Sequence, residues 1–312
     1  MSASMQGLLP EGLSKCLRQP GTARPTRIES FRCAQRVFDI SLQPGLTLAE
    51  AVGAQAARHG ITAGAVTLQG AVLEPMRFVL PAYAETDRHV AYYSATHAPE
   101  GPVRLEAATA SFGCKDGAAF LHCHALWRDA AGRELAGHIL PNEARLAAPL
   151  QARLTGTDEV SLQARFDPET NFTLFRPEAA PGHGAAGGLI VAQIGPNEDF
   201  ISAIETICQR HGLRQGRVLS GIGSLIGVKF ADGREIPAQP SELLVLEGEI
   251  RPGPDGAGMA EIEIVLVDVA GRLHRGRPAK GLNPVLICAE LFIADHAGDP
   301  PAETARSLTP PR

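Results

Sequence analysis

The chain has 312 residues, of which 44% are hydrophobic and 20% charged, so it is long enough for two globular domains and is not a disordered chain. Its net charge of −5 excludes a basic field over the whole surface of the kind that draws proteins onto nucleic acid. No apolar run is long enough to cross a membrane, none of the six cysteines forms a Cys-x-x-Cys pair, and the N-terminus lacks a secretory signal, which together favour a cytoplasmic protein with reduced thiols.

The first regular elements follow residues 1–30, which we expect to form a loose tail. A strand is predicted over Val37–Leu42, and a helix follows it. Thr47 and Glu50 have the spacing of a capping box at the helix start, and Gly60 is typical of a helix end. An apolar stretch after this glycine predicts a further strand.

The segment 119–140 is the most informative part of the chain, because it predicts a hairpin that gathers histidines. Asp129-Ala-Ala-Gly-Arg133 is typical of a three-residue loop with its glycine in the left-handed conformation. If Asp129 pairs with Arg133, His124 lies directly opposite His138 on the other strand. Residues two apart on one strand share a face, so His122 lies on the same face as His124. This register brings together three imidazoles: His122, His124 and His138.

Three converging imidazoles suit a divalent transition metal, with zinc the best fit, and leave positions open for water or a ligand. The alternative is a histidine-rich hairpin with no ligand, and we favour the metal site. Cys123 points to the opposite face and is not counted as a ligand. Asn142 and Glu143 follow the third histidine and are candidates for a fourth ligand, a residue supporting the ligands or a general base, although a plain polar turn also explains them.

The chain then repeats itself. Residues 176–188 are rich in Pro, Gly and Ala and are predicted to be a linker. Beyond this linker, 196–230 aligns with 44–78 without a gap, and 261–277 aligns with 122–138. Two blocks in the same order indicate an internal duplication.

The predicted fold class is therefore α+β, with two homologous domains that each pack a mostly antiparallel sheet against one main helix. The domains span 31–175 and 189–295, and 296–312 is expected to be a second loose tail. The first copy is longer than the second within 81–118. The strands expected in the second copy are Leu189–Ile194, Arg217–Leu225, a hairpin at 260–279, and Val285–Ile293.

The second copy lacks the histidines. Glu261, Glu263 and Arg277 occupy the three aligned positions, and the hairpin register predicts an ion pair between Glu263 and Arg277. An arginine on this face disfavours a cation by like-charge repulsion. The second copy is expected to serve the assembly or to help wall the site of the first.

The histidine hairpin resembles that of the plant and prokaryote conserved (PPC) domain family. The first copy matches the H-x-H…DxxGxxxxGH pattern, while the second matches better at Gly221-Ile-Gly223-Ser. The resemblance implies an α+β domain that forms trimers through its sheets. In plants the family domain follows an AT-hook in DNA-binding nuclear proteins, and several bacterial members look like metal-site proteins. For a chain with two domains, the resemblance implies one of two assemblies. In the first, three chains form stacked rings of homologous domains; in the second, the two domains alternate around a mixed ring.

Three functions follow from these observations. The leading one is a metal-binding protein, catalytic or not, that takes a small polar ligand at a domain or subunit interface. The alternatives are a DNA-binding or regulatory protein and a structural oligomerisation module. Arg275-Gly276-Arg277-Pro278 has the AT-hook core, but it falls in a predicted strand without a basic flank, which disfavours nucleic acid as a partner.

Overall fold

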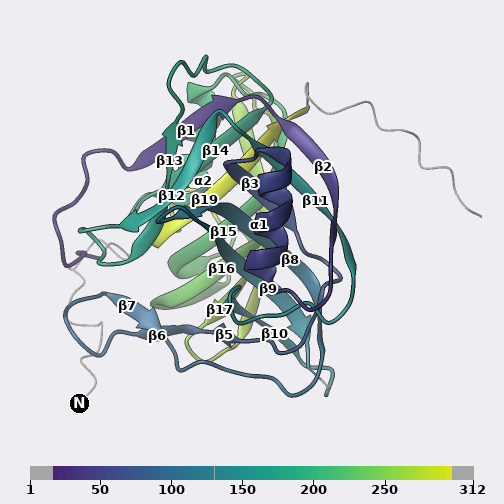
Figure 1. Cartoon of the computed structure of the whole chain (residues 1–312). Coiled ribbons are helices and arrows are strands. Elements are labelled where there is room, and N and C mark those ends of the chain that lie inside the picture. Colours follow the sequence, from purple (N-terminus) through teal and green to yellow (C-terminus); the bar gives the residue numbers. More distant parts are fainter. Residues whose placement is uncertain (1–16, 130, 297–312) are drawn as a thin grey trace, which may run out of the picture.

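The computed structural model describes residues 17–129 and 131–296, which form two large sheets, each with one helix, and a separate two-stranded sheet (Figure 1). The first sheet and its helix consist mainly of β2 (Arg36–Leu42), α1 (Leu48–His59), β3 (Ala63–Thr67), β8 (Val103–Lys115), β9 (Ala118–Arg128), β10 (Glu134–Ile139) and β11 (Leu150–Thr157). The shorter or peripheral strands of this half are β4 (Val72–Leu73), β5 (Phe78–Val79), β6 (Pro81–Tyr83), β7 (Ala91–Tyr93), β12 (Val160–Phe166) and β13 (Thr173–Ala179).

The second sheet and its helix come from the other half of the chain and one N-terminal strand. They consist of β1 (Ile28–Cys33), β14 (Leu189–Ile194), α2 (Phe200–Arg210), β15 (Gly216–Lys229), β16 (Glu235–Pro252), β17 (Gly258–Asp268), β18 (Leu273–Gly276) and β19 (Val285–Asp295). No helix within the described residues is long and apolar enough to span a membrane.

The two sheets share one strand order. The first runs β2-β11-β3-β8-β9-β10 and ends with β5, and the second begins with β1 and runs β14-β19-β15-β16-β17-β18. In each, the first strand of the unit lies beside its last strand, followed by the remaining four in chain order. Neighbours along both paths are antiparallel. The prediction of mostly antiparallel sheets with one main helix each is confirmed.

Each helix buries one face against its own sheet. In α1, Leu48, Val52 and Ala56 recur at helical spacing and are fully buried. Gly53 leaves room for Ala119 of β9, which packs directly against the helix backbone there. The predicted capping box forms, and Gly60 ends the helix in the left-handed conformation. Figure 1 shows α1 lying across the front of the strands, with α2 farther back.

The opposite faces of the two sheets pack on each other. Leu126 and Ala136 of the β9–β10 hairpin join Ile222 and Leu244 of the second sheet in one buried cluster. A second cluster joins Ala65 and its neighbours to Leu189 and Phe292 of the second half. Side chains on the face of β9 turned away from α1 therefore lie between the two halves.

The Asp-x-x-Gly-Arg loops of the two halves have the same structure for the same reason. In the first, Asp129 Oδ1 accepts hydrogen bonds from the backbone of Ala131 and Arg133. In the second, Asp268 Oδ1 accepts from Ala270 and Arg272, and its Oδ2 accepts from the side chains of Arg272 and His274. The glycine of each loop has the positive φ that the predicted three-residue turn requires.

Replacing Asp268 by asparagine is expected to destabilise the chain by about 1–3 kcal/mol, because the buried Oδ2 position would present an amide to two donors. Burial raises the pKa of Asp268, but the hydrogen bonds from His274 and Arg272 outweigh it, so the folded pKa lies below 3.8. As pH falls, Asp268 therefore becomes protonated at a higher pH in the unfolded chain than in the folded chain. The stability difference between wild type and Asp268→Asn should be full above about pH 5 and should shrink as pH falls through the folded pKa.

Urea denaturation at pH 7 and at pH 3 measures this difference. The matched control is Asp129→Asn in the more exposed first loop, for which a smaller loss is expected because no histidine among the described residues bonds to Asp129. Equal losses for the two variants, or a difference that does not depend on pH, would contradict the role given to Asp268.

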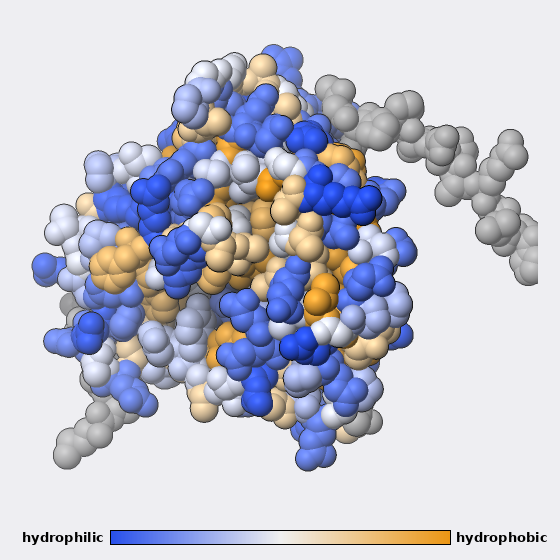
Figure 2. Space-filling view, viewed as in Figure 1, coloured by the Kyte–Doolittle hydropathy of each residue, from blue (hydrophilic) through white to orange (hydrophobic). Residues whose placement is uncertain are grey.

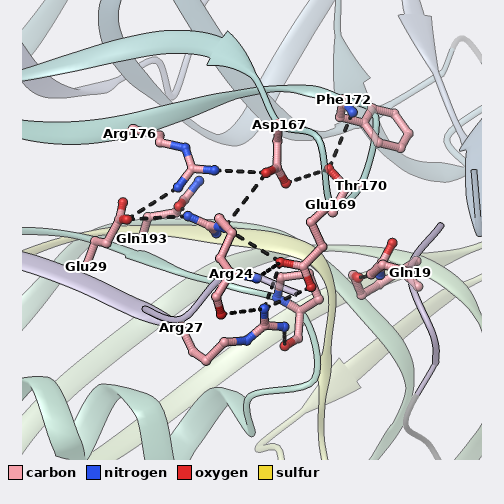
Figure 3. Close-up of polar contacts among 12 residues, drawn as sticks. Gln19, Arg24, Arg27, Glu29, Asp167, Glu169, Thr170, Phe172, Arg176 and Gln193 are labelled. Carbon is pink, nitrogen blue, oxygen red and sulfur yellow. Dashed lines mark hydrogen bonds and ion pairs between the residues drawn. The ribbon is translucent and has the colours of Figure 1, made fainter. Parts of the chain in front are cut away.

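Residues 17–30 are not the loose tail that the sequence predicts, and residues 1–16 lie outside the described part. Leu17 is buried, and β1 pairs with β14 along its whole length, so this segment packs on the second half of the chain. Buried polar contacts hold this segment against the rest of the chain. The sequence does not show them, because the charged residues of the segment are spaced apart. Figure 3 shows this network, in which Arg24 and Arg27 meet the carboxylates of Asp167 and Glu169.

The remaining boundaries also differ in part from the prediction. β13 continues to Ala179, inside the predicted linker, because it pairs with β12 along its length. Residues 180–188 contain turns with two glycines at positive φ, as the linker composition suggests. Of the second predicted tail, 297–312 lies outside the described residues.

Candidate metal centre

The β9–β10 hairpin gathers the three predicted histidines. His124 lies directly opposite His138, as the loop register predicts, and His122 shares their face. The potential ligand atoms of the three rings all lie within 4.8 Å of one another. Cys123 points the other way into the core under α1 and is fully buried there. Alternation along β9 thus separates a polar face from a core face.

The second half of the chain fixes the orientation of two of these rings. Nδ1 of His124 lies 2.8 Å from the backbone oxygen of Leu243 in β16, and Nδ1 of His122 lies 3.0 Å from Oε1 of Glu290 in β19. Both oxygens are acceptors, so each Nδ1 carries the hydrogen and donates it. Such bonds leave Nε2 of each ring free to bind a metal ion.

The two free nitrogens face each other. Nε2 of His122 and Nε2 of His124 are 3.1 Å apart. Two neutral rings in these tautomers would bring lone pairs together, which is unfavourable unless a proton or a cation lies between them. Two nitrogens bound to one zinc ion at 2.0–2.1 Å are about 3.3 Å apart at a tetrahedral angle, close to the spacing in this hairpin.

Burial keeps two of the rings neutral. Desolvation lowers the pKa of His124 to about 3, helped by neighbouring His122 and only partly opposed by the Leu243 carbonyl. Desolvation, together with His122 and His124, also lowers the pKa of His138. Desolvation lowers the pKa of His122 as well, but the Glu290 carboxylate outweighs it and leaves that pKa raised. The cluster thus offers neutral imidazole nitrogens near pH 7, with His122 the ring on which a proton competes with a metal ion.

A second carboxyl group lies beside the rings. Glu242 of β16 is 3.8 Å from Nδ1 of His138 and 3.9 Å from Nε2 of His124, and burial raises its pKa to about 8. Within the described residues, Nδ1 of His138 and one oxygen each of Glu242 and Glu290 are buried without a hydrogen-bond partner. Buried polar atoms are seldom left so, and their convergence indicates that a bound group completes the site.

These atoms line one end of a cavity of about 280 Å³ between the two halves. β9 and β10 supply the histidines, β16 and β19 supply the two carboxyl groups, and the β6–β7 hairpin covers one side. The ring of Tyr93 meets the ring of His138 edge-on at 5.1 Å. This hairpin belongs to 81–118, the segment by which the sequence alignment makes the first half longer than the second. The second half thus helps to wall the site, one of the two roles that its sequence suggests.

The other predicted candidates lie elsewhere. Asn142 and Glu143 are exposed and do not line the cavity, and Glu143 Oε2 lies 3.5 Å from Arg77 Nε. In the second copy, Glu261 pairs with Arg251 at 3.4 Å. The predicted ion pair between Glu263 and Arg277 is wrong: none joins them in the described structure, because β18 ends at Gly276 and the backbone of Arg277 turns to bond Ala231.

Sequence reasoning missed Glu242 and Glu290, because both come from the copy without histidines. Glu290 leaves a signal, since it is the one charged residue within the otherwise apolar run of Val285 to Ala294. A charge in such a run is rarely buried without a partner. Glu242 leaves none, because it is one of four glutamates in a strand that is polar at both ends.

The AT-hook-like tetrapeptide lies only partly on the expected strand, since Arg275 and Gly276 end β18 and Arg277 and Pro278 follow it. Arg275 is in β18, where its side chain pairs with Glu134 at 3.0 Å and its backbone oxygen accepts a hydrogen bond from Arg234. An AT-hook needs free arginines in an extended basic segment. On the face shown in Figure 2, hydrophilic and apolar residues are mixed.

Comparison with protein families finds one domain. Residues 182–297 match the model of the Plants and Prokaryotes Conserved (PCC) domain, and the first half of the chain lies outside the matched range. No curated protein matches this chain. The matched range contains the second sheet except β1, together with α2, Glu242 and Glu290.

Solved structures similar to part of the chain are single-domain in size. A plant- and prokaryote-conserved protein from Pyrococcus horikoshii is 14% identical, with a TM-score of 0.37, over 46% of this chain and 94% of that one. A metal-containing protein from Archaeoglobus fulgidus is 17% identical, with a TM-score of 0.36, over 47% and 96%. A putative DNA-binding protein from Bacteroides thetaiotaomicron is 12% identical, with a TM-score of 0.35, over 48% and 98%.

Proposed function

We propose that this chain is a metal-binding protein whose three histidines hold one divalent transition metal ion, zinc being the best fit, in a cavity that takes a small ligand. The observation that carries the proposal is the pair of facing Nε2 atoms, 3.1 Å apart, on rings whose Nδ1 hydrogens are committed to Leu243 and Glu290. Three nitrogen ligands leave coordination positions open. A bound metal would polarise an oxygen atom of the ligand placed there.

Metal analysis of untagged protein tests the proposal. We expect about one zinc, or another transition metal, per chain, because the second copy has no comparable cluster among the described residues. Protein stripped by a chelator should take up one equivalent of zinc and gain thermal stability in proportion to the logarithm of free zinc. A stripped protein that takes up no metal at micromolar zinc would refute the proposal.

Replacing Glu290 by glutamine is expected to weaken zinc binding by about 10–100-fold, the range typical of residues that orient a histidine ligand. Glutamine keeps the size of the side chain, but its neutral oxygen is a weaker acceptor for the Nδ1 hydrogen of His122. Competition with a chromophoric chelator measures the affinity.

The matched control for this variant is Glu263→Gln, at a position of the second copy that the structure places outside the cavity. Its zinc affinity should equal that of the wild type. A Glu290→Gln variant that also binds zinc as the wild type does would contradict the orienting role.

We further propose that the two halves, 31–175 and 189–295, are diverged copies of one domain. The shared strand order and the similar Asp-x-x-Gly-Arg loops support this relationship. Self-association into a trimer or a trimer-like ring stays a prediction from the family resemblance, and sedimentation velocity measures it.

A further inference from the structure

The cavity joins a polar end to an aromatic mouth. The polar end holds the three imidazoles and the carboxyl groups of Glu242 and Glu290. At the mouth, the ring of Phe172 lies 5.7 Å from Tyr92 and 5.9 Å from Tyr93. Tyr92 is 50% exposed and Tyr93 is 37% exposed, so apolar ring surface faces the opening without being covered by the chain itself.

The walls between these ends are mainly apolar, with hydroxyl groups from Thr173, Ser224 and Ser241. Phe120 and Phe175 meet edge-on at 5.3 Å, and Leu286 and Ile287 of β19 complete the wall from the second half. Flat apolar ligands gain most from such walls, because aromatic contacts add to the free energy of burying apolar area.

The charge of the lining restricts the ligand further. Of the described residues that line the cavity, none is Lys or Arg, and two carry carboxyl groups. Proteins bind phosphates and other polyanions with Arg, Lys or helix N-termini, none of which this cavity offers. A polyanionic head group would therefore meet Glu242 and Glu290 with only the metal ion to attract it.

We propose that the cavity binds a small molecule with a flat, apolar body and a single oxygen-donor head of at most one charge, with the head at the histidine cluster and the body between the aromatic side chains. This inference rests on the proposed metal site. The cavity lining defines the class of ligand, and this class excludes phosphate esters and other polyanions.

The rigidity of the mouth supports a preference for flat bodies. Asn171 Nδ2 donates to the backbone of Arg88 at 2.7 Å, and His89 Nε2 lies 3.3 Å from the Asn171 backbone oxygen. These contacts tie the β6–β7 loop to the β12–β13 loop that carries Phe172. The aromatic side chains are thus held at a fixed spacing before a ligand arrives, which lowers the entropy lost on binding.

Titration calorimetry with three probes on the zinc-loaded full chain tests the inference. Benzohydroxamic acid and acetohydroxamic acid share a head and differ in the ring, whereas phenyl phosphate keeps the ring and carries a polyanionic head. We expect benzohydroxamic acid to bind at least about 10-fold more tightly than either of the others, because only it matches both ends of the cavity.

Two variants locate the effect at the mouth. Tyr93→Leu and Phe172→Leu should each reduce the preference for benzohydroxamic acid over acetohydroxamic acid by about 3- to 10-fold, with one zinc still bound per chain. The matched controls are Tyr83→Leu and Phe166→Leu, which change exposed aromatic side chains outside the cavity and should leave the preference unchanged.

The outcomes separate this inference from the metal site. Equal binding of the two hydroxamic acids, or tighter binding of phenyl phosphate, by a chain that holds one zinc overturns the ligand class and leaves the metal site standing. An unchanged preference in both mouth variants also overturns it. A chain that takes up no zinc overturns the proposed function and this inference together.

Discussion

Replacing His124 by alanine is expected to abolish metal binding, lowering zinc affinity by more than the 10–100-fold that a change in an orienting residue costs. His124 is 3% exposed, and its two nitrogens have separate tasks, since Nδ1 donates to Leu243 and Nε2 faces His122. Alanine removes a ligand and leaves two imidazoles, fewer than the three protein ligands of an open zinc site. Metal analysis and chelator competition measure the loss.

The matched control is His59→Ala, which removes an imidazole that stacks on Phe38 at 4.0 Å and lies outside the cluster. His59→Ala should retain one zinc per chain. A second readout is thermal: saturating zinc should raise the melting temperature of the wild type and of His59→Ala but not of His124→Ala. A His124→Ala variant that keeps wild-type zinc content at limiting free metal would exclude this hairpin as the binding site.

Local sequence patterns predicted the hairpin correctly because its geometry is determined within about twenty residues. The Asp-x-x-Gly-Arg loop sets the register through hydrogen bonds to Asp129, and alternation along β9 does the rest. The same holds for α1, whose two ends are set by Thr47 with Glu50 and by Gly60. Each of these features satisfies its own backbone groups locally, so no distant contact is needed to predict it.

The parts that sequence reasoning missed depend on contacts between distant segments. Glu290 lies 168 residues beyond His122 in the numbering, yet their side chains meet at 3.0 Å. The β1 strand pairs with β14 of the second half, although neither strand contains a signal for its partner. Polar side chains at such contacts resemble surface residues in sequence, and only packing of the two halves shows that they are buried.

The N-terminal segment leads to the second large prediction. Arg27→Ala is expected to destabilise the chain by about 3–5 kcal/mol, because it would leave the buried Glu169 carboxylate with one ion-pair partner in the described structure, Arg24, whose Nε lies 3.7 Å away. Nη1 of Arg27 donates to both oxygens of Glu169 at 2.8 and 2.7 Å, and Nη2 donates to the Pro196 backbone at 2.6 Å. Glu169 is 1% exposed, so water cannot replace these bonds. Figure 3 shows how closely the guanidinium approaches this carboxylate.

Chemical denaturation of the apo protein measures the loss, with Arg153→Ala as the matched control. Arg153 and Asp39 form a pair at 3.2 Å whose side chains are 61% and 79% exposed, and such surface pairs contribute little. If Arg27→Ala destabilises no more than Arg153→Ala, the buried network does not hold the N-terminal segment.

A second substitution separates the stranded charge from the lost packing. Adding Glu169→Gln to Arg27→Ala removes the poorly compensated carboxylate while keeping an acceptor for the Arg24 backbone N–H, which donates to Glu169 at 3.0 Å. The double variant should therefore be more stable than Arg27→Ala alone, because the larger part of the loss is the cost of a buried charge that Arg24 compensates only from 3.7 Å. Glu169 lies on the loop that carries Phe172. Arg27→Ala should therefore also weaken the preference for benzohydroxamic acid over acetohydroxamic acid, without lowering the zinc content. A double variant less stable than Arg27→Ala would show instead that Glu169 stabilises the loop through its bonds to Arg24 alone.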